Sequence, residues 1–411
     1  RPLYWGWGRG GGGAARGASG SAPGGGRPVV YFASEIKAIR TACPGYESVT
    51  PGSVAVFRVD AGRAVRGPAW ARTRLFPWER GAAQAEVSGA QASGPQVSGE
   101  QLSDEAAVEQ LEALLRRAVV KRLMADVPLG VLLSGGLDSS LVAALARQHY
   151  EGPLHSFAVG TPDSPDLDAS ARVAAALGTV HHVRTFTEAD ARRLLPTVIY
   201  HLESFDAPLV RSALANYLVF EMASEHVRVA LSGEGSDELF AGYESLAGLE
   251  GPALGAELAR LVELLHNTNL QRSDRMGLAF GVEARVPFLD MELLDWAFSL
   301  PAHLKRRTEG DRMVDKWVVR ALARRFLPEN IAARPKAKFS QGSGAAAALS
   351  RLAEELLSDG EWRRLQARCP DVPLNSREQA LYLRLFLDFY PEPAARRAIG
   401  LTRSVVPGEV A

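Results

Sequence analysis

Short apolar runs alternate with stretches of helical periodicity between Asp104 and about residue 250. The predicted strands end at Leu133, Val159, Thr185 and Leu231. The predicted helices between them cover residues 108–122, 141–149 and 169–177. Strands that are apolar throughout and alternate with helices are typical of a parallel sheet covered on both faces. We therefore predict an α/β fold for this part of the chain.

Beyond residue 250 the strand pattern fades and helical periodicity dominates, which predicts a helical lobe packed on the sheet. Within it, residues 278–290 have a helix-like pattern that places Glu283 and Arg285 in an apolar stretch. Charges inside apolar surroundings cost stability unless they pair or contact a ligand. We expect these two side chains to form a structural pair.

The first hundred residues have a different character. Residues 28–33 and 54–59 are strand-like, and a capped helix start is predicted at Ser34. Residues 8–26 are mostly glycine, alanine and serine, which cannot bury enough apolar surface to fold, so we predict a surface loop insertion. Residues 77–103 repeat Ser-Gly among Gln, Ala and Pro, which predicts a flexible linker.

The most specific motif follows the strand that ends at Leu133. It is the string Ser134-Gly135-Gly136-Leu137-Asp138-Ser139-Ser140, and a helical pattern follows it. Two glycines allow the backbone to approach a ligand closely, so that successive N–H groups and a helix N-terminus can face an anion. Asp138 would repel a phosphate unless a cation lay between them, and Mg²⁺ is the usual ion. The motif predicts a Mg-nucleotide site; an ordinary capped strand-turn-helix is the alternative.

A second glycine-rich turn, Ser232-Gly233-Glu234-Gly235-Ser236-Asp237-Glu238, follows the strand that ends at Leu231. Open α/β sheets bind ligands beyond the carboxyl ends of their strands, so the two turns should converge. Asp138 and Asp237 would then form a carboxylate pair able to bridge Mg²⁺ and phosphate oxygens. Glu234 would be free to act as a base or a positioning group. The alternative is a solvated acidic turn that caps a helix.

Two cationic features lie outside these turns. Residues 334–344 combine Lys336 and other basic residues with glycines, and a cation can stabilise a developing phosphoryl charge. A solvated basic loop is the alternative. Arg211 is a lone arginine in a mixed segment and by itself indicates a structural role. His155, His181 and His182 have no metal-ligand spacing, so we expect them in the core or at the surface.

The charge balance, the cysteine positions and the apolar runs exclude several classes of function. Lys plus Arg equals Asp plus Glu at 47 each, so no overall field recruits nucleic acid or an anionic membrane. The two cysteines, Cys43 and Cys369, lie far apart, which argues against a zinc site or a disulfide framework and indicates a reducing compartment, the cytosol. No apolar run approaches the roughly 18 residues that a membrane span requires. The chain begins with Arg1, which indicates a fragment or a processed chain.

The motifs, taken together and in order, resemble those of glutamine-hydrolysing asparagine synthase. The stretches that carry the resemblance are residues 134–140, 231–243, 282–290 and 334–344. By this resemblance residues 104–411 form a synthetase domain. The implied fold is α/β, a parallel-sheet ATP-pyrophosphatase domain of the adenine nucleotide α-hydrolase-like type with a C-terminal helical lobe.

The resemblance also implies roles for individual residues, with ATP and Mg²⁺ as cofactors. Asp138 and Asp237 would hold Mg²⁺. Glu234 would be the base for ammonia attack, and Arg211 with Lys336 would stabilise charge during adenylation. The implied nucleotide-binding residues are Leu133, Ser134, Gly135, Gly136, Asp138, Ser139, Ser140, Val159, Ser232 and Gly233.

The implied reaction amidates L-aspartate. The side-chain carboxylate would be activated as β-aspartyl-AMP with loss of pyrophosphate, and ammonia would then displace AMP to give L-asparagine. Two alternatives remain: a related amidotransferase that adenylates another acid, because fold does not determine substrate, and a non-catalytic nucleotide-binding homologue. A homodimer is the expected assembly, without nucleic-acid or membrane partners.

Residues 1–76 resemble the tail of the family's N-terminal glutaminase domain, an α+β fold of the Ntn type. The stretches that carry this resemblance are residues 1–5, 32–38 and 51–53. In that domain the nucleophile is the cysteine at the mature N-terminus, and neither Cys43 nor Cys369 can replace it. We therefore expect the chain as given to use ammonia rather than to hydrolyse glutamine, unless a missing segment completes that domain in the whole protein.

Overall fold

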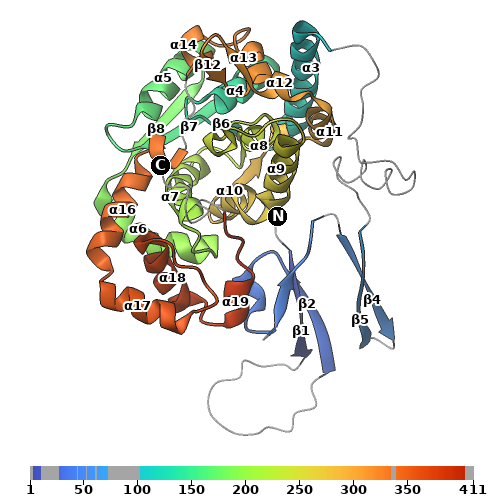
Figure 1. Cartoon of the computed structure of the whole chain (residues 1–411), viewed down its shortest axis with the longest axis vertical. Helices are drawn as coiled ribbons and strands as arrows, with labels where there is room; N and C mark the ends of the chain where they lie inside the picture. The colour runs from blue at the N-terminus through green and yellow to red at the C-terminus, as the bar shows by residue number, and fades with distance from the viewer. Residues whose placement is uncertain are drawn as a thin grey trace.

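The computed structural model shows an N-terminal group of strands beside a larger α/β body (Figure 1). The described residues are 3–10, 27–43, 45–51, 53–60, 63–72, 102–334 and 339–402. Lys336, most of the predicted linker and most of the glycine-rich segment therefore lie outside the described residues.

A five-stranded sheet forms the centre of the α/β body. Its strands, all parallel, run in the order β10-β9-β6-β7-β8. Their bounds are β6 (Leu129–Leu132), β7 (His155–Gly160), β8 (Val180–Thr185), β9 (Val229–Leu231) and β10 (Glu283–Arg285). The predicted parallel-sheet α/β fold is confirmed.

The helix-like pattern predicted around Glu283 is wrong, because residues 283–285 form the edge strand β10. The preceding helix, α10, ends at Leu278, and Gly281 follows with a φ of +68°, a left-handed conformation that redirects the backbone. The chain then pairs with β9. The expected pair is present, with Arg285 Nε 3.2 Å from Glu283 Oε1.

Helices cover both faces of the sheet, and each face has its own hydrophobic core. Neighbouring strand residues point to opposite faces. Val131 and Leu231 face a core shared with α3, α4 and α13, whereas Phe157 and Ala230 face one shared with α6, α7, α16 and α18. The sheet helices are α3 (Asp104–Leu123), α4 (Leu137–His149), α5 (Pro165–Leu177), α6 (Glu188–Leu202), α7 (Ala207–Ser224), α8 (Ser236–Leu239), α9 (Gly251–Leu264) and α10 (Asn269–Leu278).

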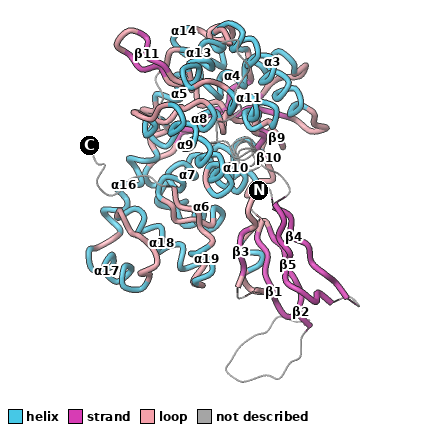
Figure 2. Tube along the Cα trace, turned by 45° about the vertical axis from the view of Figure 1, so that its right-hand side comes forward, coloured by secondary structure: helices cyan, strands magenta, loops and turns pink. Residues whose placement is uncertain are grey.

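The chain beyond β10 is mainly helical, as predicted, and its last helices form a lobe against α6 and α7 (Figures 1 and 2). The helices are α11 (Met291–Ser299), α12 (Ala302–Lys305), α13 (Trp317–Ala323), α14 (Glu329–Ala332), α15 (Phe339–Gly342), α16 (Ala345–Leu356), α17 (Asp359–Arg368), α18 (Arg377–Phe389) and α19 (Pro393–Arg397). A short hairpin of β11 (Arg307–Glu309) and β12 (Arg312–Val314) interrupts them.

The N-terminal strands form two small antiparallel sheets. One has the order β2-β1-β3, and the other pairs β4 with β5. The elements are β1 (Tyr4–Gly10), β2 (Arg27–Ala33), α1 (Ile36–Ile39), β3 (Tyr46–Ser48), β4 (Ser53–Asp60) and β5 (Arg63–Arg72). Strand β1 continues through residues 8–10, the first part of the segment predicted as a loop insertion.

A buried ion pair joins the N-terminal region to the α/β body. Glu203, in the left-handed conformation after α6, is fully buried and accepts hydrogen bonds from the backbone N–H groups of Ile36 (2.7 Å) and Lys37 (2.8 Å). Its Oε2 lies 2.5 Å from Nη1 of Arg275. Nη2 of the same arginine donates to the Ser34 carbonyl at 2.8 Å. The Glu203 carboxylate therefore pairs with donors from both the N-terminal region and the α/β body.

Replacing Glu203 with alanine should destabilise the chain by about 3–5 kcal/mol, because the buried Arg275 guanidinium and two backbone N–H groups lose their partner. Urea unfolding followed by circular dichroism measures the effect. Glu221→Ala is the matched control, since Glu221 pairs with Arg184 at a half-exposed position and should cost less than about 1 kcal/mol. Equal costs for the two variants would contradict this interpretation of the junction.

Candidate functional site

The first glycine-rich turn leads directly from β6 into α4. The Leu133 N–H donates to the Phe157 carbonyl at 2.8 Å, which extends the strand pairing to the start of the turn. Gly135 has a φ of +69°, and a Cβ there would lie 2.4 Å from the backbone nitrogen of Ser170 on α5. Only glycine fits this position, because both the conformation and the contact exclude a side chain.

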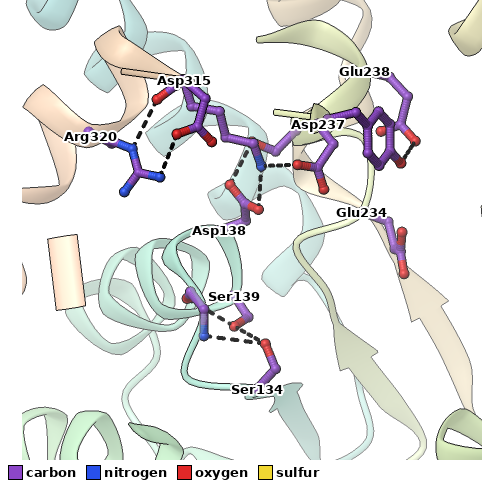
Figure 3. Close-up of polar contacts among 12 residues, drawn as sticks. Ser134, Asp138, Ser139, Glu234, Asp237, Glu238, Asp315 and Arg320 are labelled. Atoms are coloured by element: carbon purple, nitrogen blue, oxygen red, sulfur yellow. Dashed lines mark hydrogen bonds and ion pairs between the residues drawn. The ribbon is translucent and has the colours of Figure 1, made fainter. Parts of the chain in front are cut away.

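Helix α4 begins at Leu137 rather than at Leu141, where the sequence pattern placed it. Gly136 is the N-cap, and Leu137 is buried in the core, so the helix can start directly after the turn. Asp138 and Ser139 therefore lie in the first helical turn, where the helix dipole favours negative charge. The Ser134 and Ser139 hydroxyl oxygens are 3.1 Å apart at this helix end (Figure 3).

The second turn follows β9 and packs on the first. A Cβ at Gly233 would lie 2.8 Å from both the Asp138 Cβ and the Ser139 nitrogen, so the missing side chain permits this approach. The Ser236 hydroxyl donates to Asp138 Oδ1 at 2.7 Å. The expected convergence of the two turns, at the carboxyl ends of neighbouring parallel strands, is present.

A buried lysine joins the carboxylates of the two turns. Lys316 Nζ lies 2.6 Å from Asp138 Oδ2 and 2.6 Å from Asp237 Oδ1, and its side chain is 1% exposed. Asp138 and Asp237 face each other across the site (Figure 3). Gly242 makes room for the lysine, because a Cβ there would lie 2.0 Å from Lys316 Cε. We call Asp138, Asp237 and Lys316 the carboxylate–lysine cluster.

Lys316 was missed at the level of sequence because no local signal identifies it. It stands between Asp315 and Trp317, outside every glycine-rich motif, and enters the site through its left-handed backbone (φ +51°) at the start of α13. Lys316 and Asp138 are so far apart along the chain that the sequence does not predict their contact. Only the packing of α13 against α3 and α4 brings the lysine to the turns.

The two carboxylates of the carboxylate–lysine cluster, Asp138 and Asp237, have the donor chemistry of a divalent-cation site. Two carboxylates that approach one ammonium at 2.6 Å can also supply oxygens to one ion. Mg²⁺ is usually bound through one or two carboxylates together with phosphate oxygens and waters. The predicted metal role of Asp138 and Asp237 stays a prediction that this arrangement supports.

Glu234 lies on the same turn and pairs with Arg272 of α10. Arg272 is 5% exposed and also donates from Nη1 to Asn269 Oδ1 at 3.3 Å. The partly exposed Glu234 carboxylate is therefore held in one position by a buried cation. Sequence reasoning missed Arg272, which lies in an amphipathic helix without a motif.

A second acid of this turn, Glu238, is buried behind Asp237. It accepts hydrogen bonds from the Tyr243 hydroxyl at 2.6 Å and from Asn269 Nδ2 at 3.0 Å. Burial, followed by the negative charge of Asp237, raises the pKa of Glu238 to about 7. Protonation of Glu238 would limit the negative charge that accumulates beside Asp237.

The basic segment predicted at residues 334–344 reaches the first turn through Arg334. Its guanidinium donates to the Gly135 carbonyl at 3.0 Å and to Asp166 Oδ1 at 2.7 Å. Arg320 pairs with Asp315 at 2.8 Å (Figure 3). It also donates to the Arg334 carbonyl at 2.9 Å. Lys336 falls on residues 335–338, outside the described part of the chain, so its predicted role stays a prediction.

The remaining predicted site residues do not all contact the two glycine-rich turns. Arg211, on α7, forms an ion pair with Glu378 of α18 rather than with either turn, and its role in adenylation stays a prediction. The predicted nucleotide-binding residues Leu133, Val159 and Ser232 lie at or next to strand ends, and Ser140 lies in the first turn of α4. All four are buried.

Comparisons with known proteins agree with this geometry. A family model described as asparagine synthase matches residues 110–252 and 250–403. Asparagine synthetase (glutamine-hydrolyzing) 2 of Arabidopsis thaliana is 34% identical over 417 residues, which cover 97% of this chain and 64% of that protein. Asparagine synthetase (glutamine-hydrolyzing) of Brassica oleracea is 39% identical over 301 residues, 69% of this chain and 51% of that protein.

A comparison with solved structures gives a weaker match. NMN synthetase from Francisella tularensis has a TM-score of 0.34 and 14% identity, covering 74% of this chain and 100% of that chain, a likeness too low to indicate a shared function. In the part of the chain that the structure describes, no helix combines the length and apolar character needed to cross a bilayer.

The two plant proteins extend beyond the matched region, since the chain spans 64% and 51% of their lengths. The family match nevertheless covers most of the residues from the start of the α/β body to the C-terminal lobe, including both turns and Lys316. By these matches and the parallel sheet that carries its two converging turns, the chain belongs to the asparagine synthase family.

Proposed function

We propose that this chain carries out the ATP-dependent amidation of L-aspartate to L-asparagine through β-aspartyl-AMP, with release of AMP and pyrophosphate. The observation that carries the proposal is the carboxylate–lysine cluster, which lies at the N-terminus of α4 beside the serine hydroxyls of the first turn. Similarity to proteins named asparagine synthetase supports the choice of acid.

Adenylation would take place at the meeting point of the two turns. An aspartate side-chain oxygen attacks the α-phosphorus of ATP, the bond from that phosphorus to the bridging oxygen breaks, and pyrophosphate leaves. The N-terminus of α4, with Ser134 and Ser139, would hold the pyrophosphate. Asp138 and Asp237 are proposed to hold Mg²⁺, which would neutralise phosphate charge. Lys316 would add a fixed positive charge beside the developing negative charge.

Amidation would follow on the same face. Ammonia attacks the activated carbonyl carbon, the carbon–oxygen bond to AMP breaks, and the nitrogen loses a proton. Glu234 is the proposed acceptor of that proton, held in position by Arg272. Arg211 and Lys336 are proposed to stabilise charge during adenylation. Glutamine-derived ammonia would serve equally if a complete glutaminase domain were present.

We further propose a cytosolic location. Cys43 and Cys369 are both buried and unbonded to each other, which suits a reducing compartment. A homodimer stays a prediction.

The direct test measures AMP and pyrophosphate release with Mg-ATP and ammonium, comparing L-aspartate, L-glutamate and no acid, with asparagine detected by mass spectrometry. AMP and asparagine formed only with L-aspartate would support the proposal. AMP formed with another acid alone would identify a different amidotransferase. ATP binding without AMP from any acid would indicate a non-catalytic homologue.

Asp138→Asn should lower the rate of AMP formation by at least about 100-fold, because it removes one of the two carboxylates proposed to hold Mg²⁺. Initial rates at saturating ATP and several magnesium concentrations measure the effect. Asp168→Asn is the matched control, since Asp168 also lies in the first turn of a sheet helix, α5, but is exposed. A fully active Asp138→Asn variant would exclude the metal role.

Glu234→Gln should separate the two half-reactions. The variant keeps its shape and should still exchange labelled pyrophosphate into ATP when aspartate is present, while asparagine formation falls by about 100-fold or more. Glu244→Gln, an exposed acid just after the turn, should change neither rate. Equal loss of exchange and amidation in Glu234→Gln would show that Glu234 acts before ammonia attack.

Two buried lysines allow a charge-matched comparison. Lys316→Met should abolish AMP formation and destabilise the chain by about 3–5 kcal/mol, since two neighbouring carboxylates lose their shared cation. Lys305→Met should keep activity, because Lys305 has no carboxylate partner among the described residues; burial lowers its pKa to about 8. Rate assays and urea unfolding of both variants test this, and an inactive Lys305→Met would contradict it.

A further inference from the structure

Three histidines from separate segments meet on the face of the sheet that α7 covers. His155 is the first residue of β7, His182 lies in β8, and His226 lies in the connection between α7 and β9. Nδ1 of His155 is 2.9 Å from Nε2 of His182. The His226 ring stacks on the His182 ring with centroids 3.9 Å apart. No metal-ligand spacing along the chain marks this group, because its members are 27 and 44 positions apart.

The donor atoms are close enough for one ion. One nitrogen from each of the three rings lies within 4.8 Å of the other two. Two nitrogens bound to the same ion at about 2.1 Å lie roughly 3.0–3.4 Å apart. The His155–His182 contact is therefore already near the spacing of two ligands of one metal.

The chemistry of the group favours a borderline-soft ion. Imidazoles suit Zn²⁺, Cu²⁺ and Ni²⁺ rather than Mg²⁺, and they bind metals in the neutral form. Burial, followed by the neighbouring His226, lowers the pKa of both His155 and His182, which favours the neutral form of these rings. In the described part of the chain no hydrogen bond engages the His226 ring, so its nitrogens are available.

The ring arrangement requires one adjustment. His226 and His182 are stacked with an interplanar angle of 25°, whereas a ligand nitrogen must point its lone pair at the metal. His226 lies after the end of α7 at Ser224 and before β9 begins at Val229, outside regular secondary structure. Rotation of its side chain therefore breaks no helix or strand hydrogen bond.

We propose that His155, His182 and His226 bind a divalent transition-metal ion of the Zn²⁺ class, which would join β7, β8 and the α7–β9 connection. Water would complete the coordination. His155 begins β7, whereas the glycine-rich turns follow the ends of β6 and β9, so the ion lies away from the carboxylate–lysine cluster. The inference does not depend on asparagine synthesis.

The test measures metal binding by untagged protein that has been treated with a chelator and then dialysed. Calorimetric titration with Zn²⁺ should show one site per chain, and Co²⁺ should give the visible absorption of a nitrogen-ligated ion. His226→Ala and His182→Ala should each weaken Zn²⁺ binding by at least about 100-fold, more than the loss of an outer-shell partner. Zn²⁺ should also raise the melting temperature of the parent chain but not of His226→Ala.

His181→Ala is the matched control, because His181 adjoins His182 in β8 but its Nδ1 lies 2.8 Å from the Ser156 hydroxyl on the opposite face. This variant should keep one Zn²⁺ site. His303→Ala, an exposed histidine elsewhere, should keep it as well. Absence of Zn²⁺ binding in the parent, or unchanged binding in folded His226→Ala, would overturn the proposal.

Discussion

The contact of one buried ammonium with two carboxylates organises this molecule. Asp138 lies in the first turn of the helix after β6, Asp237 lies on the turn after β9, and Lys316 comes from the helical region that follows the sheet. A buried charge is tolerated only when it is paired, so the buried Lys316 ammonium needs the two carboxylates. The same contact joins the two glycine-rich turns and attaches the helical region to the sheet.

The turns can approach because side chains are missing where the backbones meet. At Gly135 the neighbouring atom belongs to α5, at Gly233 to the start of α4, and at Gly242 to Lys316. Arg334 closes the same region from the C-terminal side by binding both Gly135 and Asp166. The site is thus assembled from four separate stretches of chain, and the sheet alone determines where two of them lie.

A second buried ion pair, between Glu203 and Arg275, joins the N-terminal region to the α/β body. Glu203 accepts hydrogen bonds from the helix start at Ile36 and pairs with Arg275, which lies three residues after Arg272, the partner of Glu234. Helix α10 therefore contacts both the N-terminal region and the candidate site. Arg272 and Arg275 of α10 thus link the candidate site to the N-terminal region through direct contacts.

The sequence by itself determined the parallel sheet, the two glycine-rich turns and the approach of Asp138 to Asp237, because apolar periodicity and strand-end position are local properties. Tertiary structure decided the rest. Lys316 and Arg272 reach the site only through helix packing, residues 283–285 became an edge strand because β9 offered a free edge, and three histidines met across β7 and β8. Such contacts join residues that are far apart in the chain, so the local spacing of residues does not predict them.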